Sequence, residues 1–418
     1  MNKLVVGGAA VLEGSVDIAG AKNSALPILL ATVLSSGKVT LRNVPILRDT
    51  TTVLELLNKL GAEITVSEDS SLEIDTSKIE NFRADYDLVK TMRASILVLG
   101  PLLAKYGSAY VSLPGGCAIG SRPVDLHLFG LERLGADITL SEGYVNAAVD
   151  GRLTGNSVNF DVVSVGATEN IMMAATLAEG ITVIDGAATE PEVSDLANFL
   201  VAMGAKISGI GSSRLVIEGV KSLHGCDYSV IPDRIEAGTY LIAAAMTRGS
   251  VTVNNVNPAH LDIVLDMLKN IGAVINCTSD SITLDMQGRR PEAKSISTGP
   301  YPYFPTDLQA QWLALSTVSS GKCLIEENIF ENRFMHVHEM KRMGADIRLQ
   351  GNSAEVFGKD SLSGAKVMAT DLRASASLVL AALVADGETT IDRIYHIDRG
   401  YTYLEEKFMS LGATIKRI

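Results

Sequence analysis

Six copies of one pattern run through the chain and limit what it can fold into. In each copy a helix-like stretch ends in a Gly-Ala step, and a β-prone run follows, as in residues 57–64 (LNKLGAEI) and 131–138 (LERLGADI). The glycines of this step recur every 68 to 74 residues, at positions 61, 135, 204, 272, 344 and 412. Each stands where the end of a helix needs a left-handed residue. The chain therefore reads as six copies of one supersecondary unit.

A second glycine completes the unit. It lies 23 to 28 residues before the first, at positions 37, 107, 180, 249, 321 and 387, between an Ala/Leu-rich helix and another β-prone run. Each unit thus reads helix, strand, helix, strand, and further short strands are predicted at 72–74, 214–217 and 281–284. The first helix of a unit is apolar nearly all round and is predicted to be buried, as at 26–34, 95–103, 171–178, 241–245 and 374–384.

Three units are enough for one compact body, so two domains are predicted. The first spans residues 22–229, and the second combines residues 1–21 with 230–418. Residues 3–18 precede the first unit and are expected to form one strand that closes the C-terminal body. The chain would then cross between the bodies near 19–21 and 226–230.

The starts of the six buried helices share one register. The residues 14 or 15 positions before the second glycines are Lys22, Arg93, Gly166, Arg234, Asp307 and Arg373. Helix starts carry free backbone N–H groups and favour anions, so six starts around a common centre would build a cleft rich in anion sites. Two simpler readings stay open: charges gather at helix ends because ends are solvated, and Asp307 by itself reads as a helix N-cap.

A Gly-rich loop at 113–125 carries a thiol and a cation. It lies between a predicted strand at 109–113 and a predicted helix at 124–134, and long patternless connections are often active-site lids. Cys117 lies five residues from Arg122, whose charge would lower the pKa of the thiol and make it reactive. Cys226, Cys277 and Cys323 lack such a setting and are expected to be small buried side chains.

Composition excludes several classes of protein. The 418 residues are 47% hydrophobic with a net charge of −12, which argues against a nucleic-acid surface. No apolar run reaches the roughly 18 residues of a membrane span, and Glu13 and Asp17 interrupt the only apolar stretch that could serve as a signal peptide. Four cysteines without paired spacing predict neither a disulfide framework nor a metal site. A cytoplasmic location is expected.

Specific strings add a resemblance to a known family. They are GAKNSALP (20–27), DLVKTMRAS (87–95), LPGGC (113–117) with RPVDLH (122–127), FPTDLQA (304–310), FENRFMHV (330–337), DLRAS (371–375) and DRGY (398–401). From end to end, the chain closely resembles the UDP-N-acetylglucosamine 1-carboxyvinyltransferase family. The resemblance implies an inside-out α/β barrel of two domains, each with three β-α-β-α-β-β repeats and buried helices.

The same resemblance implies a reaction. That family transfers the enolpyruvyl group of phosphoenolpyruvate to the 3-hydroxyl of UDP-N-acetylglucosamine and releases phosphate, without a cofactor. This reaction is the first committed step of peptidoglycan synthesis. The resemblance therefore implies a role in cell-wall biogenesis, cell shape, the cell cycle and cell division. Phosphoenolpyruvate carries a carboxylate and a phosphate, which planar guanidinium groups bind bidentately.

Residue roles follow by resemblance. Lys22, Arg122 and Arg399 are expected at the phosphate, with Asn23 as a further donor, and Arg333 and Arg373 at the carboxylate. Asp307 is the candidate base for the hydroxyl proton, and Asp371 is a second candidate for proton transfer at the methylene carbon. Cys117 is the expected proton donor and the target of the epoxide antibiotic fosfomycin; because it is Cys and not Asp, sensitivity is predicted.

The nucleotide-sugar is expected in the N-terminal body. Its predicted contacts are Arg93, Arg122, Pro123, Val124, Asp125, Leu126, Ser164, Val165 and Gly166, with Asp307 and Ile329 near the sugar. Many members of the family have Lys where this chain has Val162, which removes one charged contact to the diphosphate.

Two rival functions stay open. The enolpyruvyl transferase of the shikimate pathway needs the same phosphoenolpyruvate clamp but lacks the Cys loop and the RPVD string. A non-catalytic scaffold that only binds a nucleotide-sugar is the alternative of another class.

Overall fold

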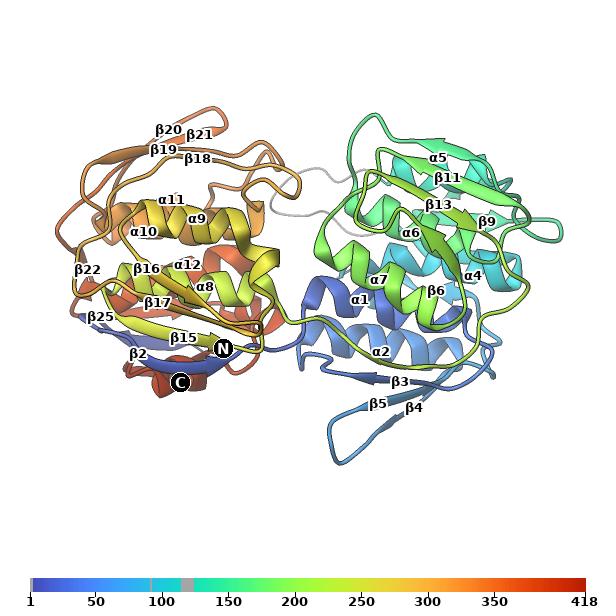
Figure 1. Cartoon of the computed structure of the whole chain (residues 1–418), viewed down its shortest axis with the longest axis horizontal. Helices are drawn as coiled ribbons and strands as arrows, with labels where there is room; N and C mark the ends of the chain where they lie inside the picture. The colour runs from blue at the N-terminus through green and yellow to red at the C-terminus, as the bar shows by residue number, and fades with distance from the viewer. Residues whose placement is uncertain (1–2, 91, 114–123) are drawn as a thin grey trace. The chain divides into compact units, whose positions relative to one another are not determined.

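The computed structural model describes residues 3–90, 92–113 and 124–418, which form two compact units (Figure 1). The central unit holds residues 20–113 and 124–231, and the terminal unit holds residues 3–19 and 232–418. The chain passes from one unit to the other after Ala19 and after Ile231.

Each unit contains three four-stranded sheets of one design. A parallel pair is followed by two antiparallel neighbours, in the order β14-β3-β5-β4 for the first sheet of the central unit. The strands of that sheet are β3 (Val39–Arg42), β4 (Glu63–Val66), β5 (Leu72–Asp75) and β14 (Asp227–Ser229). The second sheet contains β6 (Arg83–Ala84), β7 (Ser108–Ser112), β8 (Asp137–Ser141) and β9 (Tyr144–Ala148), and the third contains β10 (Ser157–Asn159), β11 (Ile181–Asp185), β12 (Lys206–Ser208) and β13 (Arg214–Glu218).

The terminal unit repeats the design. Its sheets are β2-β15-β17-β16, β18-β19-β21-β20 and β23-β25-β1-β26. Their strands are β1 (Leu4–Gly7), β2 (Glu13–Asp17), β15 (Ser250–Asn254), β16 (Val274–Cys277), β17 (Ser281–Asp285), β18 (Ile296–Ser297), β19 (Lys322–Glu326), β20 (Asp346–Gln350), β21 (Ser353–Phe357), β23 (Lys366–Met368), β25 (Glu388–Asp392) and β26 (Ile415–Arg417). A further short pair joins β22 (Leu362–Ser363) to β24 (Ala385–Asp386).

The N-terminal segment corrects one prediction. Residues 3–18 form two strands where one was expected, and they belong to different sheets: β1 lies between β25 and β26, and β2 pairs in parallel with β15. Gly14, the second residue of β2, has a φ of 118°, in the left-handed region that a side chain disfavours. The segment thus supplies one strand to each of two sheets of the terminal unit.

Helices fill the interior of each unit, as the repeat pattern predicts. In the central unit these are α1 (Lys22–Ala31), α4 (Leu99–Tyr106) and α6 (Val165–Ala175), and in the terminal unit α8 (Arg234–Met246), α10 (Gln309–Val318) and α12 (Leu372–Leu383). All are buried almost all round, and Figure 1 shows the strands on the outside of each unit. A helix enclosed by sheets has no solvent face, which explains why its apolar residues are not confined to one side.

The second helix of each repeat has less apolar surface than the first. These helices are α2 (Arg48–Leu60), α5 (Asp125–Arg133), α7 (Pro191–Ala202), α9 (Asp262–Asn270), α11 (Val337–Arg342) and α13 (Leu404–Ser410). On α2 the buried positions are Val53, Leu56, Leu57 and Leu60. All six glycines of the Gly-Ala step have positive φ, from 88° to 115°, which confirms their role as helix ends. Shorter turns are α3 (Tyr86–Val89), η1 (Thr32–Leu34), η2 (Arg93–Val98), η3 (Pro258–Leu261), η4 (Thr306–Leu308) and η5 (Ile394–Arg399).

Two further predictions have different outcomes. Of the three cysteines expected to be buried, only Cys323 is; Cys226 is half-buried and Cys277 is exposed because it ends β16 at a sheet edge. The Gly-rich loop is flanked by β7 and α5 as predicted, but Cys117, Arg122 and Pro123 lie outside the described residues. Among the residues that the structure describes, no helix is long and apolar enough to cross a membrane.

Candidate active site

Three charged side chains meet in the terminal unit and are here called the arginine–aspartate centre. Asp307 in η4 accepts hydrogen bonds from Nη2 of Arg333 and Nη2 of Arg373, both at 2.9 Å. The two arginine side chains are 5% and 4% exposed, and the carboxylate is 25% exposed. Arg373 comes from the first turn of α12, and Arg333 from the turn that precedes α11. The register of helix starts predicted Asp307 and Arg373 together, and they are in contact.

The electrostatics of this centre favour an anion. Burial by itself would raise the pKa of Asp307, but the charges and hydrogen bonds of Arg373 and Arg333 outweigh it and hold the pKa well below its usual range. One carboxylate thus faces two buried guanidinium groups. Nη1 of Arg333 and Nη1 of Arg373 are both buried and have no hydrogen-bond partner among the described residues. Unpartnered buried donors are rare and costly, and an oxyanion would satisfy both.

Other predicted residues lie around this centre. Asp371 caps α12, because its Oδ1 accepts from the backbone N–H of Arg373 and of Ala374, each at 3.0 Å. Arg399 ends η5, and Ile329, 37% exposed, follows β19. Burial lowers the pKa of His396, and the charges of both Asp371 and Arg399 act on its ring. Asp371 therefore has a structural task as a cap whether or not it also transfers a proton.

The central unit holds a second charged pair at the start of α1. Nζ of Lys22 lies 2.7 Å from Oδ2 of Asp49 in α2, with the side chains 11% and 5% exposed. Asn23 is next in the chain and exposed. Ser24, which is fully buried, donates to Asp195 of α7, and the same carboxylate accepts from Tyr228 at 2.6 Å. The first turn of α1 is thus fixed by carboxylates on both sides.

The start of α6 carries another group of predicted residues. Ser164 caps the helix by accepting from the backbone N–H of Ala167 at 3.3 Å. A side chain at Gly166 would place its Cβ 3.1 Å from the ring of His127, so the ring would have to shift by a few tenths of an ångström to admit it. Burial, followed by the charge of Arg93, lowers the pKa of His127 to about 4, against a smaller opposing effect of Asp125. The structure therefore brings Arg93, Asp125 and Gly166 near one histidine, with Val124, Leu126 and Val165 on the same two helix starts.

Three residues of these sites were not predicted. Asp49 is the partner of Lys22, Asp195 anchors Ser24, and Asn170 donates from Nδ2 to the carbonyl of Ile96 at 3.2 Å while its Nδ2 lies 3.1 Å from Nδ1 of His127. Asn170 also accepts from the N–H of Gly100 at 2.8 Å. A polar amide inside the apolar α6 is a readable signal. The sequence gives no such signal for Asp49, because acidic residues are common in the first turn of a helix.

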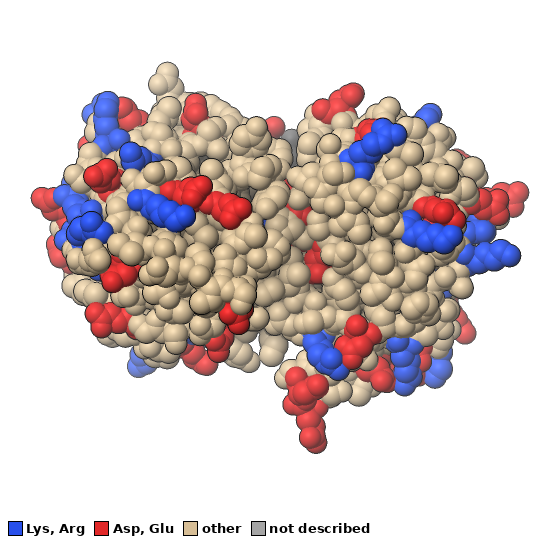
Figure 2. Space-filling model, in the orientation of Figure 1, with Lys and Arg blue, Asp and Glu red and all other residues tan. Residues whose placement is uncertain are grey.

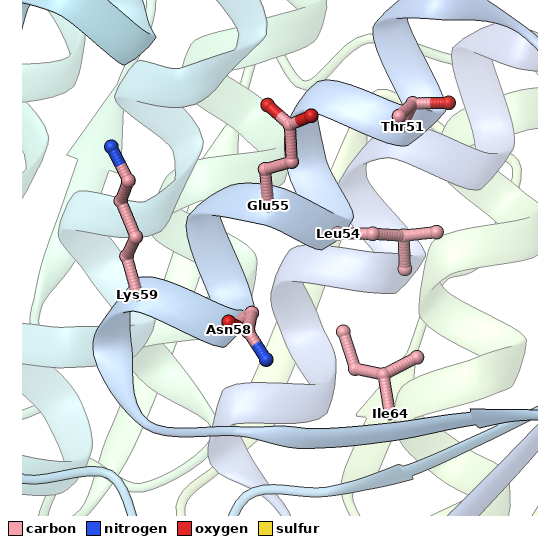
Figure 3. A pocket seen from close by; sticks show the side chains of 6 residues that line it. All are labelled: Thr51, Leu54, Glu55, Asn58, Lys59 and Ile64. Carbon is pink, nitrogen blue, oxygen red and sulfur yellow. The ribbon is translucent and has the colours of Figure 1, made fainter.

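One groove on the described surface lies apart from these sites. A shallow groove on α2 and β4 is lined by Thr51, Leu54, Glu55, Asn58, Lys59 and Ile64 (Figure 3), and none of these is a predicted site residue. Figure 2 shows Lys and Arg interspersed with Asp and Glu on the visible face, with no large area of one sign.

Comparisons with known proteins agree with the geometry. A family model described as EPSP synthase (3-phosphoshikimate 1-carboxyvinyltransferase) matches residues 6–408. The enolpyruvyl transferase NikO from Streptomyces tendae superposes with a TM-score of 0.90 at 26% identity, over 100% of this chain and 98% of that one. EPSP synthase from Acinetobacter baumannii has a TM-score of 0.77 at 19% identity, over 100% of both chains, and shows the fold alone. The family model, which covers most of the chain, defines a protein of the carboxyvinyltransferase class.

The relatives narrow that class. The UDP-N-acetylglucosamine 1-carboxyvinyltransferases of Coxiella burnetii strains Dugway 5J108-111 and RSA 493 are each 59% identical over 418 residues, which is 100% of this chain and 96% of theirs. The chain belongs to the UDP-N-acetylglucosamine 1-carboxyvinyltransferase family. The predicted fold, a two-domain inside-out α/β barrel with buried helices, is confirmed.

Proposed function

We propose that this chain transfers the enolpyruvyl group of phosphoenolpyruvate to the 3-hydroxyl of UDP-N-acetylglucosamine and releases phosphate. The observation that carries the proposal is the arginine–aspartate centre, where two buried guanidinium groups share one carboxylate and keep one donor each without a partner. Relatives 59% identical over the whole chain bear the name of this reaction.

The substrate fits the cations by charge and shape. The carboxylate of phosphoenolpyruvate would bind Nη1 of Arg333 and Nη1 of Arg373, because planar forks suit planar carboxylates. Lys22, Arg122 and Arg399 would bind the phosphate, with Asn23 as a further donor. Arg122 lies outside the described residues, so its part rests on the sequence.

Asp307 would act as the general base. Addition forms a bond from the 3-oxygen of the sugar to C2 of phosphoenolpyruvate, while the hydroxyl proton goes to a base and another proton reaches the methylene carbon. Elimination then removes a proton from that carbon together with phosphate. Paired with two arginines, Asp307 is a weak base, because its pKa is held well below the usual range. A substrate carboxylate on the same arginines would draw off their charge, so substrate binding would raise the basicity of Asp307.

Two groups are candidates for the proton at the methylene carbon. Asp371 is one, and its Oδ1 is already engaged by two backbone N–H groups. Cys117 is the other, and it lies outside the described residues.

The nucleotide-sugar would bind chiefly to the central unit. Its contacts would be Arg93, the first turns of α5 (Val124, Asp125, Leu126) and α6 (Ser164, Val165, Gly166), and Arg122 and Pro123 of the loop. Ile329 and Asp307 would lie at the sugar. Val162 is 68% exposed and supplies no charge to the diphosphate, so backbone N–H groups at 163–166 would carry more of its binding.

Release of phosphate tests the proposal. The purified chain is incubated with phosphoenolpyruvate and either UDP-N-acetylglucosamine or shikimate 3-phosphate. Release with the nucleotide-sugar alone is expected. Release only with shikimate 3-phosphate would assign the chain to the other reaction, and no release with either would leave a binding scaffold.

Covalent inhibition tests the loop. Fosfomycin is expected to alkylate Cys117 and abolish activity, whereas a Cys117→Asp variant is expected to remain active in its presence. Activity and peptide mass both unchanged at saturating fosfomycin would reject the role of Cys117.

The cellular setting follows from the reaction. Both substrates are cytoplasmic metabolites, so we place the protein in the cytoplasm at the first committed step of peptidoglycan synthesis. Depletion of the protein would then disturb cell shape and division, and accumulated UDP-N-acetylglucosamine would be the metabolic sign to measure.

A further inference from the structure

We propose that Arg399 is held for catalysis by two anchors that flank it in the chain, and that Arg417 and Tyr401 are positioning residues that make these anchors. The inference rests on the proposed function, in which Arg399 binds the phosphate of phosphoenolpyruvate. Neither Arg417 nor Tyr401 is assigned a contact with substrate.

The first anchor grips the residue before Arg399. Oδ1 of Asp398 accepts from Nη2 of Arg417 at 2.8 Å, and Oδ2 accepts from Nη1 at 3.1 Å. Two parallel bonds from a planar fork fix the orientation of a carboxylate as well as its position. Arg417 is itself held, because it pairs with Leu4 in the sheet between β26 and β1 and also donates to Glu405. The last strand of the chain thus reaches the segment that carries Arg399.

The second anchor grips the residue two positions after Arg399. Tyr401 is 3% exposed, and its hydroxyl lies 3.0 Å from Oγ1 of Thr239 and accepts from Nε2 of Gln311 at 3.2 Å. The same Nε2 donates to the carbonyl of Asp307 at 2.9 Å. The guanidinium of Arg373 lies 5.5 Å above the ring of Tyr401. This anchor is therefore continuous with the arginine–aspartate centre.

Gly400 lets the segment lie against α12. A Cβ at this position would stand 2.5 Å from Cδ1 of Leu372, the first residue of α12 and the neighbour of Arg373. Arg399 is thus carried on a backbone packed against α12 and tied on both sides. Loss of either anchor would let the guanidinium of Arg399 shift from its position. A misplacement of about 1 Å can lower a reaction rate by up to about 100-fold.

The competing explanation is a surface ion pair that matters only for stability. The side chains of Arg417 and Asp398 are 28% and 41% exposed, and exposed pairs contribute little. The two explanations differ in what a substitution changes. A merely structural pair would alter the melting temperature, whereas an anchor of Arg399 would alter the handling of phosphoenolpyruvate specifically.

The test is steady-state kinetics of the full chain with both substrates. Arg417→Gln is expected to lower kcat/KM for phosphoenolpyruvate by about 10-fold or more while the KM for UDP-N-acetylglucosamine stays within about twofold. Arg417→Lys should recover part of the loss, since it keeps the charge but not the fork. Lys322→Gln is the matched control, because Lys322 of β19 pairs with Glu355 of β21 at 3.2 Å, is 67% exposed, and belongs to another sheet than Arg417.

A second approach protects the test from folding defects. Asp398→Asn removes the same pair from the other side, and combining it with Arg417→Gln should add little to either loss. Tyr401→Phe keeps the ring under Arg373 but removes both hydroxyl bonds, and a loss of several-fold against phosphoenolpyruvate is expected. If all three single variants keep kcat/KM for phosphoenolpyruvate within twofold of the unmodified chain, the anchors do not position Arg399. If the unmodified chain itself releases no phosphate, the proposed function fails and this inference falls with it.

Discussion

The two charged centres of the molecule hold their cations in different ways. In the terminal unit two buried arginines share Asp307, and each leaves one nitrogen unpartnered. In the central unit one lysine lies against one carboxylate, Asp49, at 2.7 Å. A guanidinium fork presents donors in fixed directions, whereas an ammonium is a point charge that can turn between partners. The first arrangement suits recognition of a planar carboxylate, and the second suits a phosphate that arrives and leaves during turnover.

The largest expected effect comes from removing one fork. Arg373→Met should lower kcat/KM for phosphoenolpyruvate by about 1,000-fold, because it removes a buried donor for the substrate carboxylate and leaves Asp307 with one arginine. Arg373→Lys should recover little, since one ammonium cannot replace two parallel donors. Steady-state kinetics on variants whose fold is checked by circular dichroism would measure both.

A matched arginine separates this effect from a general loss of charge. Arg348 is exposed in β20 and lies 4.5 Å from the ring of Phe357, outside the centre. Arg348→Met should leave kcat/KM unchanged. Activity of Arg373→Met within about tenfold of the unmodified chain would show that the vacant nitrogens are not the substrate site.

The central pair should respond in stability more than in recognition. Asp49→Asn leaves the ammonium of Lys22, 11% exposed, without its carboxylate, and breaking a buried pair from one side costs about 3 kcal/mol. Urea unfolding would measure this cost. Excess inorganic phosphate should raise the melting temperature of the variant more than that of the unmodified chain, because an anion would replace the lost charge.

Glu63→Gln is the control for that prediction. It removes the exposed pair of Lys78 and Glu63, at 2.6 Å with 68% and 61% exposure, and should change nothing measurable. An Asp49→Asn variant as stable as this control would mean that other contacts of Lys22 already neutralise it.

These centres also show what sequence could and could not predict. The glycine repeat placed four of the six helix starts within one residue of those of α1, α6, α8 and α12, because helix ends are set by local chemistry that repeats. At the other two, the short helices η2 and η4 come first, and α4 and α10 begin at Leu99 and Gln309. The repeat gave Asp307 and Arg373 the same register, and they are in contact. The role of Arg333 came only by resemblance, since it lies in a turn outside the repeat. Asp49 and Asp195 are joined to α1 by contacts between separate helices, which no spacing along the chain encodes. For the same reason the split of residues 3–18 into β1 and β2 escaped prediction, because their partners lie more than 200 residues away.

A smaller difference concerns one buried histidine in each unit. Burial lowers the pKa of both His127 and His336 from 6.5 to about 4. For His336 the carboxylate of Asp371 opposes the shift and Arg333 adds to it, whereas for His127 Arg93 adds and Asp125 opposes. A lowered histidine pKa means that the fold prefers the neutral ring. Each histidine therefore contributes stability that is complete above pH 6.5 and is lost as the pH falls from 6.5 toward 4, by at most about 3 kcal/mol.

The two histidines differ in their partners, and substitutions can exploit this. Nδ1 of His127 lies 3.1 Å from Asn170, but neither ring nitrogen of His336 has a hydrogen-bond partner among the described residues. His336→Leu should therefore cost little at pH 7.5 and should remove roughly half of the histidine-linked loss between pH 7 and 5. The exposed His338→Leu serves as control. Equal acid profiles for the unmodified chain and His336→Leu would show that His336 is already protonated or solvated.

The smallest expected effect concerns Asp195, which holds the first turn of α1 beside the Lys22–Asp49 pair. Tyr228 donates to Oδ1 of Asp195 at 2.6 Å, and Ser24 and the backbone N–H of Ile231 bind Oδ2 of the same carboxylate. Tyr228→Phe removes one of three donors and keeps the edge-on contact with Phe199, so a loss of about 1 kcal/mol in unfolding free energy is expected. Tyr86→Phe, at a tyrosine with 52% exposure in the same unit, should cost nothing. Because Ser24 lies next to Lys22 and Asn23, a fall in kcat/KM for phosphoenolpyruvate in Tyr228→Phe would mean that the brace also sets the position of the lysine. Unchanged kinetics would confine the role of Asp195 to stability and leave Asp49 as the residue that orients Lys22.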